Sequence, residues 1–158
     1  MRRAARLAGW ALVIVTGWIG LGLWQRPPWD EGSGDPRLVA SLLHLDAEVG
    51  RAEPERMQSL FPEGYVFTRV LHGLAWAAVA ADSTLDPALR DAALAGARLA
   101  QADLATPYAR SRFQPELDPP FGAFYAGWTL WLDAELLRSD PSGLDAFRQR
   151  ADELAKAL

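Results

Sequence analysis

The stretch at residues 65–76 reads YVFTRVLHGLAW and decides the fold class. Its apolar side chains recur three and four residues apart, which is the spacing of one face of an α-helix and not the alternation of a strand. The residues on this stripe are Val66, Val70, Leu74 and Ala77. The tripeptide PEG precedes the stretch at residues 62–64, and the polar tripeptide DST follows at residues 82–84. The pattern therefore predicts one long helix that opens at PEG and ends near residue 81.

Helical spacing continues on both sides of this stretch. Further helices are predicted over residues 37–49, 53–60, 86–104, 121–138 and 145–158. Asp86 followed by Pro87 has the form of an N-cap with proline at the first helical position. A loop with four prolines, at residues 106–120, separates the two halves of this region, and connections of that length often carry function. No segment shows the alternation of a strand, so the predicted fold class is all-α.

A P-x-G pattern followed by aromatic residues occurs twice. It reads PEGYVF at residues 62–67 and PFGAFY at residues 120–125, each time before a long apolar helix, a turn and a second helix. The two copies predict two antiparallel αα-hairpins. Such hairpins resemble those of the (α/α) toroids, the fold of six-hairpin glycoside-active enzymes and related lyases and isomerases. The resemblance covers residues 62–158 and implies either a short hairpin bundle or the opening part of a longer toroid.

The N-terminal region carries a membrane signal. Residues 7–24, LAGWALVIVTGWIGLGLW, contain no charged side chain, and as a helix they would span roughly 27 Å, close to the thickness of a bilayer. Arg2, Arg3 and Arg6 precede this run, so the positive-inside rule places the N-terminus in the cytoplasm. The prediction is a single-pass protein with a signal anchor at residues 1–25, a Pro/Gly-rich linker at 26–36 and an extracytoplasmic helical domain at 37–158. A cleaved signal peptide is the alternative, although no A-x-A-like site follows the run.

The composition excludes several classes of function. The formal net charge is −4 and Lys156 is the only lysine, whereas a nucleic-acid surface needs clustered Lys and Arg. The chain has no cysteine and two isolated histidines, so no metal site is predicted. Neither a phosphate-binding glycine motif nor a serine-nucleophile motif occurs. We therefore predict no nucleic-acid partner, no cofactor and no catalytic residue.

Four polar and aromatic residues share a second stripe on the helix at residues 64–81. They are Tyr65, Arg69, His72 and Trp76. One interpretation is a ligand wall, in which Arg69 binds an anion, His72 transfers a proton and the rings stack. The other is the border of an amphipathic helix, where side chains with an apolar body and a polar tip collect. A single histidine without a placed partner favours the border.

Two further pairs of charged residues are candidates for ligand binding. Arg110 and Arg112 lie between aromatic rings in the loop at residues 106–120, where they would suit a carboxylate, a sugar or a partner protein. An ordinary solvated loop is the alternative. Asp133 and Glu135 lie in the predicted helix at residues 121–138. They are two residues apart and so point in different directions, which excludes them as an acid/base pair by themselves.

The helix at residues 121–138 is predicted to be packed on two sides. One of its stripes carries large rings and is expected to be core, and another carries small residues that let a second helix approach closely. The first comprises Phe121, Tyr125, Trp128 and Leu132, and the second comprises Gly122, Ala126, Thr129 and Asp133.

Two classes of function are compatible with these patterns. The favoured expectation is a membrane-anchored extracytoplasmic module for interaction or scaffolding, held by residues 7–24, with a protein partner and no catalysis by this chain alone. The alternative, which follows from the toroid resemblance, is the N-terminal part of an enzyme that acts on carbohydrate or another small molecule.

Overall fold

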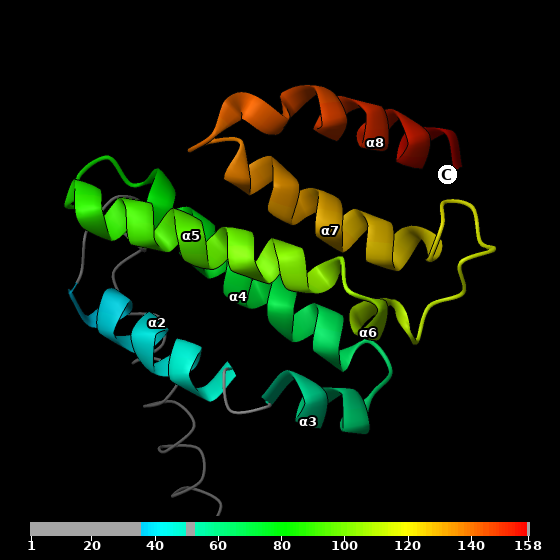
Figure 1. Cartoon of the computed structure of the whole chain (residues 1–158), viewed down its shortest axis with the longest axis horizontal. Coiled ribbons are helices and arrows are strands. Elements are labelled where there is room, and N and C mark those ends of the chain that lie inside the picture. The colour runs from blue at the N-terminus through cyan, green and yellow to red at the C-terminus, as the bar shows by residue number, and fades with distance from the viewer. Residues whose placement is uncertain (1–35, 50–52, 158) are drawn as a thin grey trace, which may run out of the picture. The chain divides into compact units, whose positions relative to one another are not determined.

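The described residues of the computed structural model, 36–49 and 53–157, form helices, turns and loops without a strand (Figure 1). The all-α prediction is confirmed for this part of the chain. None of the helices described there is long and apolar enough to cross a membrane. The predicted anchor at residues 7–24 lies outside the described residues, as does the predicted linker up to residue 35.

The helices follow the predicted order with small shifts at their ends. They are α2 (Pro36–Val49), α3 (Glu53–Leu60), α4 (Gly64–Ala81), α5 (Pro87–Leu104), α6 (Pro107–Arg110), α7 (Gly122–Leu136), the 3-10 turn η1 (Pro141–Gly143) and α8 (Leu144–Ala157). Asp86 caps α5 as predicted, since its side chain accepts hydrogen bonds from the backbone N–H groups of Ala88 and Leu89. The single-turn helix α6 was not predicted, because it lies within the proline-rich loop.

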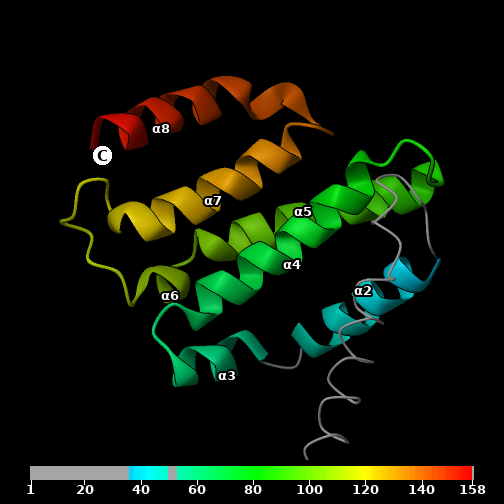
Figure 2. The same ribbon diagram turned by 180° about the vertical axis from the view of Figure 1, so that it is seen from behind.

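Two antiparallel hairpins build the domain. α4 pairs with α5 and α7 pairs with α8, while α7 lies beside α4 and runs in the same direction (Figure 1, Figure 2). α5 and α8 also run in the same direction as each other. The short helices α2 and α3 pack against α4.

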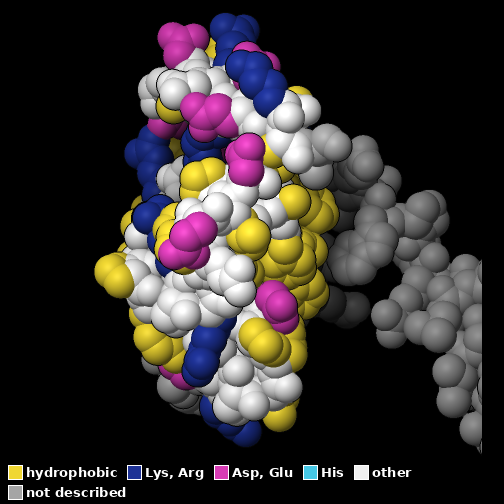
Figure 3. Space-filling view, turned by 90° about the vertical axis from the view of Figure 1, so that its right-hand side faces the viewer, with side chains coloured by type: hydrophobic (Ala, Val, Ile, Leu, Met, Phe, Trp, Pro, Cys, Tyr) yellow, Lys and Arg dark blue, Asp and Glu magenta, His cyan; other side chains and the backbone are white. Residues whose placement is uncertain are grey.

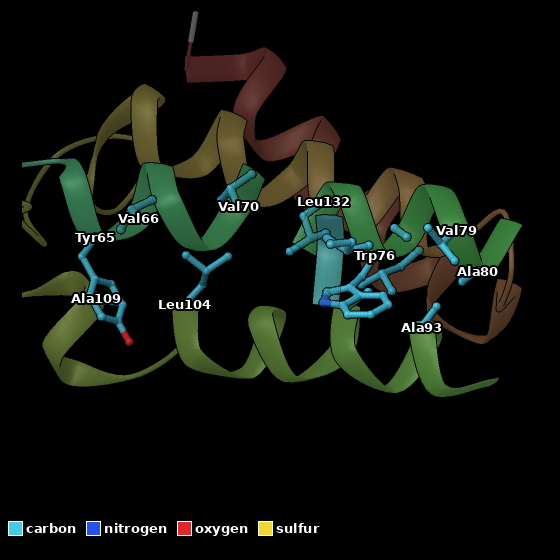
Figure 4. Close-up of a cluster of buried hydrophobic side chains, with 14 of the residues drawn as sticks. Tyr65, Val66, Val70, Trp76, Val79, Ala80, Ala93, Leu104, Ala109 and Leu132 are labelled. Carbon is cyan, nitrogen blue, oxygen red and sulfur yellow. The ribbon is translucent and has the colours of Figure 1, made fainter. Parts of the chain in front are cut away.

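The core lies where α4, α5 and α7 meet. Val66, Val70 and Ala77 of the predicted apolar stripe are buried on α4. Figure 4 shows side chains of α4 and α5 meeting between the two ribbons, with Leu132 entering from α7. α5 contributes mostly alanines to this contact, which lets its backbone lie close to α4. The buried alanines of α5 are Ala93, Ala97 and Ala100.

Candidate functional site

The stripe of Tyr65, Arg69, His72 and Trp76 is more buried than the border of an amphipathic helix would be. Tyr65 and Trp76 are each 5% exposed and belong to the core, and the side chains of Arg69 and His72 are 17% and 8% exposed. The stripe faces α5, α6 and α2, because Trp76 lies against Gly96, Tyr65 against the ring of Tyr108, and His72 against Asp46. The helical spacing of these residues was predicted correctly, but the border interpretation predicted more solvent exposure than the structure shows.

Arg69 joins α4 to the end of α5. Its Nη1 lies 3.3 Å from Oδ2 of Asp103, and its guanidinium lies 5.5 Å from the centre of the Tyr65 ring. Burial raises the pKa of Tyr65 above its ordinary value, while the positive charge of Arg69 acts in the opposite direction. These contacts give Arg69 a role in holding helices together.

His72 and Trp76 meet Asp46 of α2. The Trp76 indole nitrogen lies 3.1 Å from His72 Nε2 and 3.4 Å from Asp46 Oδ1, and Nε2 lies 3.1 Å from the same oxygen. Nε2 cannot both accept from the indole and donate to the carboxylate. If the His72 ring is neutral and its Nε2–H donates to Asp46, the indole N–H of Trp76 also points at Asp46 and not at His72. In either tautomer, the buried Nδ1 has no partner in the described structure.

Burial lowers the pKa of His72 below 6.5, with Asp46 opposing this effect and Arg69 adding to it. The unfolded chain therefore takes up a proton before the folded one does. The stability that this difference provides is complete above the unfolded pKa and is lost as the pH falls through the folded pKa.

We expect the free energy of unfolding to fall between pH 7 and pH 5, and to fall less in His72→Gln, which removes the titrating ring. Urea unfolding of the full chain at several pH values, followed by circular dichroism, measures how the free energy of unfolding depends on pH in the parent protein and in His72→Gln. His44→Gln is the control, because His44 lies on an exposed part of α2. An equal pH dependence of the free energy of unfolding in His72→Gln and the parent would contradict the lowered pKa of His72.

A partly exposed, mostly aromatic surface spans α4, α7 and the turn before α4. It comprises Phe61, Phe67, Leu71, Phe124, Trp128 and Trp131, and we call it the aromatic face. The ring centres of Phe67 and Trp128 lie 5.1 Å apart, and those of Trp128 and Trp131 lie 5.4 Å apart. Trp131 is 51%, Leu71 43% and Phe124 42% exposed. Figure 3 shows hydrophobic side chains gathered along one edge of that view.

The aromatic stripe predicted on α7 is core only in part. Tyr125 and Leu132 are buried, as predicted. Trp128 and Phe121 are partly buried and lie against the core rather than inside it. Trp128 belongs to the aromatic face, which the helical spacing alone did not separate from the core.

A groove separates α5 from α8, with α7 as its floor. Its main cavity measures about 550 Å³. The small side chains Ala126 and Thr129 of α7 line it, together with Tyr125 and Asp133. The predicted small-residue stripe therefore faces the space between α5 and α8, and only part of that space is filled.

Asp133 lies on the floor of this groove and is 8% exposed. The Gln101 amide of α5 donates to its Oδ1 at 2.6 Å, and Arg150 of α8 pairs with its Oδ2. Arg150 also donates to the Thr129 hydroxyl at 3.0 Å. Both carboxylate oxygens are thus engaged by donors, so this network anchors α8 to the rest of the domain.

Arg110 lies at the end of the groove nearest the start of α7. Its Nε donates to the Tyr125 hydroxyl at 3.0 Å, and that hydroxyl donates to the Leu104 carbonyl at 2.7 Å. The guanidinium also lies 5.1 Å from the centre of the Phe121 ring and 5.8 Å from that of Tyr125. These contacts fix the cation in the cavity wall.

Two of the eight candidate residues, Arg110 and Asp133, line the same cavity. Arg112 is exposed. Glu135 pairs with Arg138 at 2.9 Å, whereas Asp133 pairs with Arg150. Gln101 and Arg150 complete the site but were not predicted, because each stands in a helix without any local signal of its distant partner.

Within residues 36–49 and 53–157 no group of three or more His, Asp or Glu side chains is placed to hold a metal ion. Comparison of the chain with protein-family models, with curated proteins and with solved structures found no match. The function is therefore inferred from the geometry of the chain itself.

Proposed function

We propose that this protein is a membrane-anchored, extracytoplasmic helical module that binds another protein, without catalysis by this chain alone. The aromatic face carries the proposal. Side chains such as Trp, Tyr and Phe, when they stand exposed and adjacent, are typical of the anchors of protein interfaces. Here Trp131, Phe124 and Leu71 are each exposed by two fifths or more on neighbouring helices.

The size of the aromatic face suits a short partner element. Large side chains bury roughly 150–250 Å² each when covered, so these partly exposed residues leave on the order of 300 Å² of apolar area open to water. A stable interface between whole domains needs about 800 Å² on each partner. A single helix that lays a few apolar side chains on the face needs less.

The arrangement of α4 and α7 also suits a helix. The two helices lie side by side and run in the same direction (Figure 2). Rows of side chains on paired helices leave a valley into which the ridge of a third helix packs. Helix-in-groove recognition uses apolar anchors three, four and seven residues apart on the incoming helix. The expected partner segment therefore has an amphipathic helical pattern.

The proposal places the partner near the membrane. Residues 7–24 form the proposed anchor, and the linker at residues 26–36 reaches at most about 40 Å when fully extended. A domain held within that distance of a bilayer meets other membrane proteins and their membrane-proximal segments most often.

The candidate residues with groups suited to acid/base chemistry already have polar partners within the fold. His72 contacts Trp76 and Asp46, Asp133 is bonded by Gln101 and Arg150, and Glu135 pairs with Arg138. This engagement supports binding as the function in preference to catalysis.

We expect Trp131→Ala to abolish partner binding while changing the free energy of unfolding by less than about 1 kcal/mol, because the side chain is half exposed. A photoreactive amino acid at position 131 of the full chain, irradiated in native membranes, would crosslink a protein partner. Position 99 serves as the control, since Leu99 is 65% exposed on α5. Equal crosslinking at both positions, or none at position 131, would count against the aromatic face as the interface.

The alternative is that these hairpins open an (α/α) toroid that acts on carbohydrate or another small molecule. It is favoured by one observation, which is that α4 and α7 run in the same direction and that α5 and α8 also run in the same direction as each other (Figure 1). A reading frame that continues through several more P-x-G hairpins would support the toroid, and a stop codon directly after residue 158 would favour the module.

A further inference from the structure

We propose that the groove between α5 and α8 is a second binding site, which takes a small organic monocarboxylate through Arg110. The site is independent of the aromatic face. At about 100° of turn per residue, Ala126 and Leu130 lie on the opposite side of α7 from Trp128 and Trp131. A ligand in the groove therefore does not compete with a partner on the aromatic face.

Arg110 is a preorganised anion receptor. Its Nε is used by the Tyr125 hydroxyl, and two rings hold its guanidinium plane. Tyr125 is itself buried and fixed by its bond to the Leu104 carbonyl. The terminal nitrogens remain for a ligand, and a planar guanidinium matches the two oxygens of a carboxylate. Because the cation is already ordered, binding loses little side-chain entropy.

Within the described residues no carboxylate pairs with Arg110, whose contacts are the Tyr125 hydroxyl and the rings of Phe121 and Tyr125. Arg150, the other arginine of the groove, is paired with Asp133. Glu153 also lines the cavity, and the Gln149 amide donates to it at 3.0 Å. Among the described residues that line the groove, one cation without a carboxylate partner and one further carboxylate favour a ligand with a single negative charge over a dianion.

Apart from Gln101 and Thr129, the remaining residues that line the groove are apolar, and they determine what kind of ligand body fits. Ala126, Leu130, Leu154 and Pro120 line the cavity between its polar ends. The volume of about 550 Å³ is within the range of small-molecule sites. Tyr125 and Asp133 are eight residues apart on α7, so the ends of the groove lie about 12 Å apart. A carboxylate with an apolar body on the order of 10 Å long fits this space.

The probe for the test is 4-phenylbutyrate, with the neutral 4-phenylbutyramide as its isosteric control. Saturation-transfer NMR follows each compound with the full chain in phosphatidylcholine nanodiscs, and empty nanodiscs provide the blank. We expect saturable binding of the carboxylate and at least tenfold weaker binding of the amide. Equal affinity for the two compounds would overturn the proposal, because it would mean that the charge of Arg110 is not used.

Matched variants assign the binding to the groove. Arg110→Gln is expected to weaken 4-phenylbutyrate binding at least tenfold, while Arg112→Gln leaves it unchanged, because Arg112 is exposed and lines neither end of the groove. Ala126→Leu, which places a larger side chain on the groove floor, should block binding even if Arg110→Gln does not fold. Full binding in either folded Arg110→Gln or Ala126→Leu would overturn the assignment. Trp131→Ala should bind the probe normally, so failure of this site and failure of the proposed partner interface are distinguishable.

Discussion

Replacing Gly64 with alanine is expected to lower the free energy of unfolding by about 3 kcal/mol or more, as overpacking against a rigid neighbour does. A Cβ at this position would lie 2.2 Å from the carbonyl oxygen of Met57 and 2.6 Å from the backbone nitrogen of Gln58. Both are backbone atoms of α3, so no side chain can rotate to make room. The substitution must push α3 away from the start of α4.

Gly127→Ala is the matched control. This glycine also lies in a long helix, and a Cβ there would meet nothing within 4 Å. Alanine in a helix interior is favoured over glycine by about 0.5–1 kcal/mol, so the control should be neutral or stabilising. Urea unfolding of the full chain, followed by circular dichroism, compares the two. Similar losses for Gly64→Ala and Gly127→Ala would contradict the close approach of α3 and α4.

Replacing Leu132 with alanine is expected to cost about 4 kcal/mol, within the range for buried leucines. Leu132 is fully buried and fills the space where α4, α5 and α7 meet. A Cβ built at Gly73 of α4 would come within 2.9 Å of its Cδ2 and within 3.0 Å of the Ala100 Cβ of α5. Its removal would leave a cavity bordered by three helices, and the backbone of Gly73 offers no side chain to fill it.

Leu99→Ala is the control, because it makes the same leucine-to-alanine change at an exposed position. Leu99 is 65% exposed, so its truncation should change the free energy of unfolding by less than about 0.5 kcal/mol. Trp128→Ala should fall between the two, because Trp128 is only partly buried. The same unfolding measurement ranks all three variants. A smaller loss for Leu132→Ala than for Trp128→Ala would mean that the aromatic face, and not the three-helix junction, is the core.

The two glycines of the repeated P-x-G pattern are required for different reasons. Gly64 is required by the close approach of α3. Gly122 has a φ of +84°, and Phe121 before it has a φ of 69°, so a left-handed turn opens α7. A Cβ at Gly122 would meet only the side chain of Leu117, at 3.1 Å. The repeat was read from the sequence as one hairpin signal, but the physical constraint behind each copy is visible only in the fold.

The helices themselves follow from local chemistry. The spacing of apolar residues predicted α4, and the Asp86–Pro87 cap predicted the start of α5, because both signals act within a few residues of the chain. The same locality explains why the stripe of Tyr65, Arg69, His72 and Trp76 was recognised as one face of a helix. Whether that face meets water or another helix is not a local property.

The sites depend on contacts between residues far apart in the chain. Arg150 of α8 reaches Asp133 only because α8 folds back along α7, and Gln101 reaches the same carboxylate from α5. The position of Arg110 in the cavity wall depends on its hydrogen bond to Tyr125 of α7. Helical periodicity orders the residues around each axis but does not rotate one helix against its neighbours. That rotation comes from packing, through the alanines of α5 and the position of Leu132 between three helices. For the described residues, the sequence alone was therefore enough to predict an all-α arrangement of helix hairpins. Burial of the α4 stripe, exposure of the aromatic face and assembly of the groove were decided by how the helices pack.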